Sequence, residues 1–61
     1  MGPPEAEERY RLRLELEKCI GIRDALMTLK GNVSPERVPE IEAALLRIMK
    51  RITELEEALD D

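Results

Sequence analysis

Residues 41–59 read IEAALLRIMKRITELEEAL and contain the most regular apolar pattern in the sequence. Its large apolar side chains recur at intervals of 4, 3, 4, 3 and 4 residues, at Ile41, Leu45, Ile48, Ile52, Leu55 and Leu59. Such a repeat places them along one side of an α-helix and is typical of a helix that packs against a neighbouring helix. The stretch therefore predicts a helix over about residues 39–59 with one narrow apolar stripe.

A second helix is predicted upstream, over about residues 5–30, where most residues are strong helix formers. Residues 11–17 alternate polar and apolar side chains as a strand would, but the run contains no β-branched residue. A helical stripe fits the longer segment, at Leu12, Leu16, Cys19, Leu26 and Lys30, with Arg23 filling the gap in it. It is widened on one side by Ile20 and Met27 and on the other by Ile22 and Leu29. These positions cover more of the helix circumference than the stripe of about 100° that one neighbour requires. We therefore expect this helix to contact neighbours on more than one side.

The segment 31–38 is predicted to connect the two helices. Gly31 favours the left-handed conformation that ends many helices, and Ser34 is a typical N-cap residue for the next helix. Because Pro39 would lack a hydrogen-bond donor inside a helix, we expect a tight turn at residues 35–38 and a helix from about Pro39. A continuous helix kinked at Pro39 is the alternative. A connection this short predicts that the two helices are antiparallel neighbours.

The length of the chain limits how much of its own surface it can bury. Ordering 61 residues costs about 90 kcal/mol, at roughly 1.5 kcal/mol per residue, which a core of this size barely offsets. The single cysteine, Cys19, excludes an internal disulfide, and a chain without histidine is poorly suited to a structural zinc site. Association with other helices is the remaining source of stability. We therefore expect one domain over residues 1–61, frayed at residues 1–4, whose hairpins assemble into a helical bundle, with a dimeric four-helix bundle as the favoured form.

No pattern in the sequence specifies a reaction. Cys19 lies on the apolar stripe, which favours a structural core residue over a redox or metal-binding one. Most carboxylates, such as Glu40 and Glu42, project away from the stripe of residues 41–59 and are interpreted as solvated surface charge. Histidine, the commonest acid–base residue, is missing. The sequence therefore predicts no enzyme, no cofactor and no metal site.

The net charge of −4 argues against a general binder of nucleic acid or anionic membranes. Arg9, Arg11 and Arg13 form one local basic cluster, which glutamates at i,i+4 spacing, such as Glu5 and Glu7, neutralise. The sequence contains neither an apolar run long enough for a membrane span nor a signal peptide. We therefore expect a cytoplasmic or nuclear location.

Two residues of the first predicted helix each leave two interpretations open. Arg23 stands where the stripe calls for an apolar side chain. It either pairs with a glutamate of another helix and sets the register, or marks an opening where a partner supplies a carboxylate. Gly21 costs about 1 kcal/mol in a helix interior. It either permits the close approach of a second packing face or is tolerated on the solvent side.

These observations predict a protein–protein association module that forms homo-oligomers by coiled-coil-type helix packing. It would be a small regulator or the dimerisation region of a larger protein. One alternative is an adaptor that completes a bundle with a different protein, and a second is a small bundle that binds structured RNA, which the acidic charge opposes. The predicted helix-packing interface comprises Leu12, Leu16, Cys19, Ile20, Ile22, Arg23, Leu26, Leu29, Ile41, Leu45, Ile48, Ile52, Leu55 and Leu59.

Overall fold

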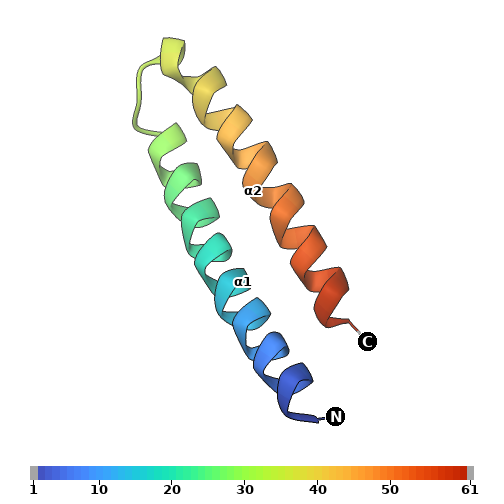
Figure 1. Ribbon diagram of the computed structural model, residues 1–61. Helices are drawn as coiled ribbons and strands as arrows, with labels where there is room; N and C mark the ends of the chain where they lie inside the picture. Colours follow the sequence, from blue (N-terminus) through green and yellow to red (C-terminus); the bar gives the residue numbers. More distant parts are fainter. Residues whose placement is uncertain (1, 61) are drawn as a thin grey trace.

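Two α-helices pack against each other in antiparallel orientation (Figure 1). The computed structural model describes residues 2–60, with side chains from residue 5 onward. Helix α1 (Gly2–Lys30) leads through a short 3₁₀ helix, η1 (Pro35–Arg37), into helix α2 (Val38–Leu59). The predicted all-helical hairpin is confirmed.

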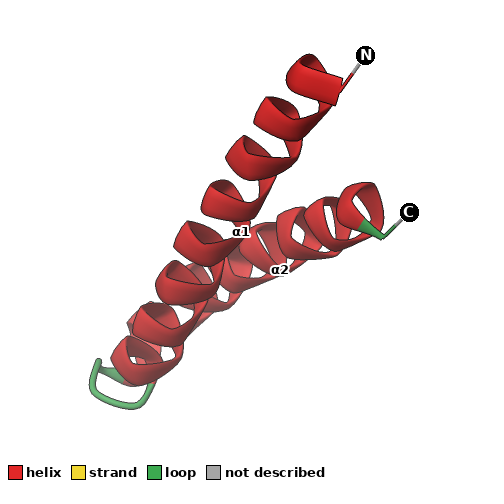
Figure 2. Cartoon of the chain, turned by 90° about the horizontal axis from the view of Figure 1, so that it is seen from below, coloured by secondary structure: helices red, strands yellow, loops and turns green. Residues whose placement is uncertain are grey.

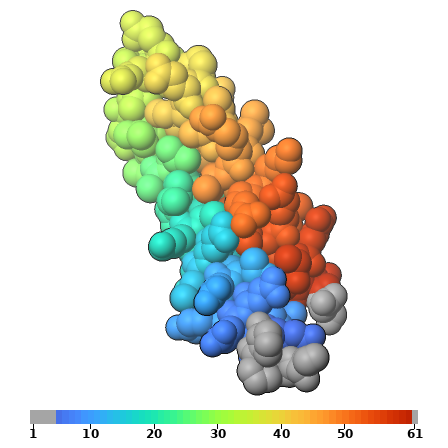
Figure 3. All heavy atoms as spheres, in the orientation of Figure 1, coloured from blue at the N-terminus to red at the C-terminus, as the bar shows by residue number. Residues whose placement is uncertain are grey.

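The molecule is a rod rather than a globule (Figure 3). It measures 51 × 14 × 12 Å, and its radius of gyration is 14.7 Å. A compact domain of the same length would have a radius of gyration of about 10 Å. Figure 2 shows that the two helices cross at an angle and separate towards the chain ends. The hairpin therefore has a single packed seam, with each helix exposed on its remaining sides.

Helix α1 begins at Gly2, three residues earlier than predicted. Residues 2–4, which were predicted to be frayed, are part of this helix, whereas Met1 lies outside the described residues. The two prolines at positions 3 and 4 fall in the first helical turn. The first N–H groups of a helix have no carbonyl partner, so proline loses nothing by lacking one there.

The connection is a tight turn, as predicted, and the alternative of a continuous kinked helix is wrong. Helix α2 begins at Val38, so Pro39 falls in its first turn and disrupts no hydrogen bond. Ser34 has the extended backbone of an N-cap residue, with φ −67° and ψ 152°, and its carbonyl accepts a hydrogen bond from the Arg37 N–H at 2.9 Å. Its hydroxyl makes no capping bond to any described residue.

The end of α1 differs from the prediction at Gly31, which does not adopt a positive φ. The N–H groups of Gly31 and Asn32 instead donate to the carbonyls of Thr28 and Leu29, at 3.2 and 2.9 Å, and tighten the last turn. The Asn32 side-chain amide also donates to the Thr28 carbonyl at 2.8 Å. Because these bonds satisfy carbonyls at the helix end, a left-handed residue is not needed there.

The core of the hairpin is small and lies between the two helices. Cys19, Ile52 and Leu55 are buried together, and Ile41 is buried separately near the start of α2. Around the three-residue cluster pack the partly buried side chains of Leu12, Leu16, Ile20 and Ile48. Leu55 is the one described side chain that is almost fully buried, at 1% exposed.

Candidate helix-packing interface

The apolar stripe of α2 packs against α1 within the same chain. Ile41, Ile52 and Leu55 are buried, and Leu45, Ile48 and Leu59 are half-buried. Cys19 is buried against this stripe from α1, as the prediction of a core residue requires. The 4–3 repeat that predicted helix packing is therefore used inside the hairpin.

The stripe of α1 is only partly covered. Leu12, Leu16, Ile20, Arg23 and Leu26 are half-buried. By contrast, Ile22 and Leu29 are 48% and 46% exposed. They lie seven residues apart, two helical turns, on a side of α1 that α2 does not cover. The hairpin thus brings together all the predicted interface residues except these two.

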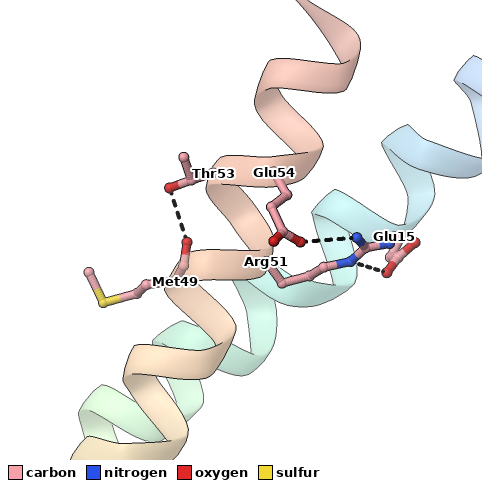
Figure 4. A network of polar contacts seen from close by, with 5 residues as sticks. All are labelled: Glu15, Met49, Arg51, Thr53 and Glu54. Carbon is pink, nitrogen blue, oxygen red and sulfur yellow. Dashed lines mark hydrogen bonds and ion pairs between the residues drawn. The ribbon is translucent and has the colours of Figure 1, made fainter.

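Ion pairs link the two helices, and the periodicity of the sequence does not predict them. Arg51 of α2 donates from Nε to Glu15 Oε2 of α1 at 2.8 Å and from Nη1 to Glu54 Oε1 at 3.3 Å (Figure 4). The hydrogen bond from Arg51 stabilises the charged carboxylate and lowers the pKa of Glu15 below its ordinary value, although partial desolvation opposes the shift. The same bonds raise the pKa of Arg51. These ion pairs lie along one side of the contact between α1 and α2.

Two further contacts tie the ends of the hairpin. Near the connection, Lys30 Nζ lies 3.0 Å from Glu42 Oε2. Near the chain ends, Arg9 donates from Nη2 to the Leu59 carbonyl at 2.9 Å and satisfies an acceptor at the end of α2. The sequence contains these charges, but their pairing depends on the register between the helices, which periodicity does not specify.

Arg23 makes no ion pair with α2 among the described residues. Its Nη2 lies 3.5 Å from Oδ1 of Asp24, its neighbour on the same helix, which is a long contact. Its Nε is buried and lacks a hydrogen-bond partner in the part of the chain that the structure describes. Within one hairpin, Arg23 therefore does not pair with a glutamate of α2, and pairing with a glutamate of another helix stays a prediction.

A groove beside Arg23 runs between the helices on one face of the hairpin. Its volume is about 490 Å³, and we call it the Arg23 groove. It is lined by Arg23, Asp24, Met27 and Lys30 of α1 and by Leu45 and Met49 of α2. Met27 is 58% exposed and Met49 is 49% exposed, so the groove presents two long, flexible apolar side chains.

Gly21 lies away from the seam. A Cβ atom added to it would meet no atom of the described residues within 4 Å. The hairpin therefore does not use Gly21 for close helix packing.

Within residues 2–60 we find no group of three or more Cys, Asp or Glu side chains that could hold a metal ion. No helix in the same range is long and apolar enough to cross a membrane.

Comparison with protein-family models, curated proteins and solved structures finds no match to this chain.

Proposed function

We propose that this protein is an association module that forms homo-oligomers by helix packing, with a dimeric four-helix bundle as the basic form. The observation behind this proposal is the apolar surface that one hairpin leaves exposed. Its large exposed apolar side chains are Tyr10, Leu14, Ile22, Met27, Leu29, Leu46 and Met49. Scattered apolar residues are normal on a surface, but seven large ones on so short a chain support the proposal of an interaction surface.

The accessible surface supports the same proposal. One chain exposes 4961 Å². A compact monomer of 7.0 kDa would expose about 4000 Å². The excess of about 900 Å² is close to the roughly 800 Å² that each partner buries in a standard interface. A second hairpin would therefore cover about as much surface as the rod shape leaves uncovered.

Helix α1 supplies most of this surface. Tyr10, Leu14, Ile22, Met27 and Leu29 belong to α1, whereas α2 contributes Leu46 and Met49. This distribution agrees with an α1 that has more apolar positions than one neighbour requires. We infer that α1 makes most of the contacts between chains.

Sedimentation equilibrium of the purified full chain tests the proposal. Over a roughly hundredfold range of protein concentration we expect a reversible equilibrium in which the dimer dominates at the upper end, and a thermal midpoint that rises with concentration. A folded, helical monomer throughout the range would overturn the proposal. A chain that stays monomeric and poorly helical would also overturn it and would favour the hetero-adaptor alternative.

A further inference from the structure

We propose that a second copy of this chain docks over the Arg23 groove, in a two-fold arrangement that pairs Arg23 of each copy with Asp24 of the other. This inference rests on the proposed homo-oligomerisation and specifies which face carries it.

Arg23 has a buried donor without a partner among the described residues. A buried side-chain nitrogen almost always has a hydrogen-bond partner in a folded protein, yet Nε of Arg23 has none among the described residues. The nearby Asp24 carboxylate contacts only Nη2, at 3.5 Å, and its side chain is 66% exposed. Nε itself is buried, so a carboxylate approaching from outside the hairpin would meet the Nη groups of this side chain, which is 35% exposed, in the planar fork that suits a carboxylate.

The lining of the groove contains side chains of both charges together with apolar side chains. In a two-fold interface the same patch meets itself, so it must contain both members of each charge pair. Lys30 is already paired with Glu42, so the Arg23 groove offers one cation, Arg23, and one carboxylate, Asp24, with Met27 and Met49 as its exposed apolar parts. It is therefore complementary to its own copy in both charge and apolar character.

The opposite face is less suited to a partner. Figure 4 shows Met49 and Arg51 on opposite sides of α2, so the ion pair between Arg51 and Glu15 covers the side away from the Arg23 groove. On that side Leu14 lies in an open depression of α1 alone, about 670 Å³ in volume and lined by the charged residues Arg11, Glu15, Glu17 and Lys18. A partner there would have to displace or desolvate these charges, which is costly.

A comparison of matched variants tests the location of the interface. Met27→Glu and Met49→Glu place a carboxylate in the groove, at positions 58% and 49% exposed. Ile22→Glu and Leu29→Glu place the same group on the side of α1 that α2 does not cover, outside the lining of the groove, at positions 48% and 46% exposed. In a symmetric dimer both chains carry the substitution, so two carboxylates are added to the interface. We expect the dimer dissociation constant to rise more than about tenfold for the groove variants and less than about threefold for the controls.

Sedimentation equilibrium measures these constants, and circular dichroism checks that each variant stays helical. A parent chain that dimerises while the groove variants dimerise equally well would overturn the docking site but not the proposed function. A larger effect of the Ile22 and Leu29 variants would also overturn the docking site but not the proposed function, and would place the interface at Ile22 and Leu29. A parent chain that is monomeric throughout would overturn both.

A mixing experiment tests the ion pair itself. Arg23→Asp leaves only carboxylates at positions 23 and 24, and Asp24→Arg leaves only cations there, so each variant should repel its own copy. We expect both to dimerise more weakly than the parent and an equimolar mixture to form heterodimers. Arg11→Asp mixed with Glu17→Arg is the charge-matched control and should show no preference for heterodimers. If the mixed Arg23 and Asp24 variants form heterodimers only in the proportion expected from random association, the proposed ion pair is overturned.

Discussion

At the scale of single residues, Gly21 is the position where the hairpin gains least from its sequence. It lies inside α1 without a positive φ, and a Cβ atom there would meet open space. Glycine in such a place weakens a helix because the unfolded chain has more backbone freedom to lose. Its presence therefore has no structural reason within one chain.

We expect Gly21→Ala to raise the free energy of unfolding by about 0.5–1 kcal/mol, because alanine restricts the unfolded chain and meets no steric obstacle in the folded one. Urea unfolding of parent and variant at one protein concentration measures the difference. A loss of stability or of dimerisation would instead show that another chain approaches the backbone closely at Gly21.

At the scale of elements, the contact between α1 and α2 combines a narrow apolar seam with ion pairs along its edges. The Glu15–Arg51 pair joins the middle of one helix to the middle of the other. The side chains of Arg51 and Glu15 are 45% and 44% exposed, and water screens a pair this accessible, so we expect it to contribute more to the register than to the total stability. Its effect depends on pH because the pKa of Glu15 is lowered by the Arg51 hydrogen bond.

A carboxyl group with a lowered pKa in the folded state stabilises that state above its ordinary pKa of about 4.3 and loses this effect as the pH falls through the lower, folded value. We therefore expect Glu15→Gln to lower the thermal midpoint at neutral pH and to have a vanishing effect in acid. Thermal melts of both chains across the acid range measure this trend. Glu17→Gln is the control, and an equal pH dependence for it would rule out a specific role for the Arg51 pair.

At the scale of the whole molecule, stability rests on very few buried side chains. Leu55 is almost fully buried between the helices, whereas Leu46, on the same helix, is 71% exposed. Replacing each of these two leucines with alanine separates the contribution of tertiary packing to stability from that of helix propensity.

We expect Leu55→Ala to cost about 2–5 kcal/mol, because it leaves a cavity where the helices meet. Leu46→Ala should change stability by no more than about 0.5 kcal/mol. A protein of this length has a total stability of roughly 3–9 kcal/mol. The first variant should therefore lose much of its helical circular dichroism at room temperature, while the second keeps it. Equal losses at the two sites would contradict the observed packing of α2.

The two helices and the turn between them could be predicted from the sequence because their causes are local. A 4–3 spacing of apolar residues places them on one side of a helix, and a proline such as Pro39 ends or begins a helix through its own geometry. The predicted start of α2 is therefore within one residue of the observed Val38, and its predicted end at Leu59 is confirmed.

The remaining features were decided by the tertiary structure. Whether Glu15 meets Arg51, and whether Arg23 finds a partner, depends on the register and crossing angle of two helices. Those follow from side-chain packing between segments far apart in the sequence. The same packing buries Cys19 and leaves Ile22 exposed, although both were predicted interface residues. Periodicity identifies the apolar side chains of a helix, but only the position of its neighbour determines which of them are covered.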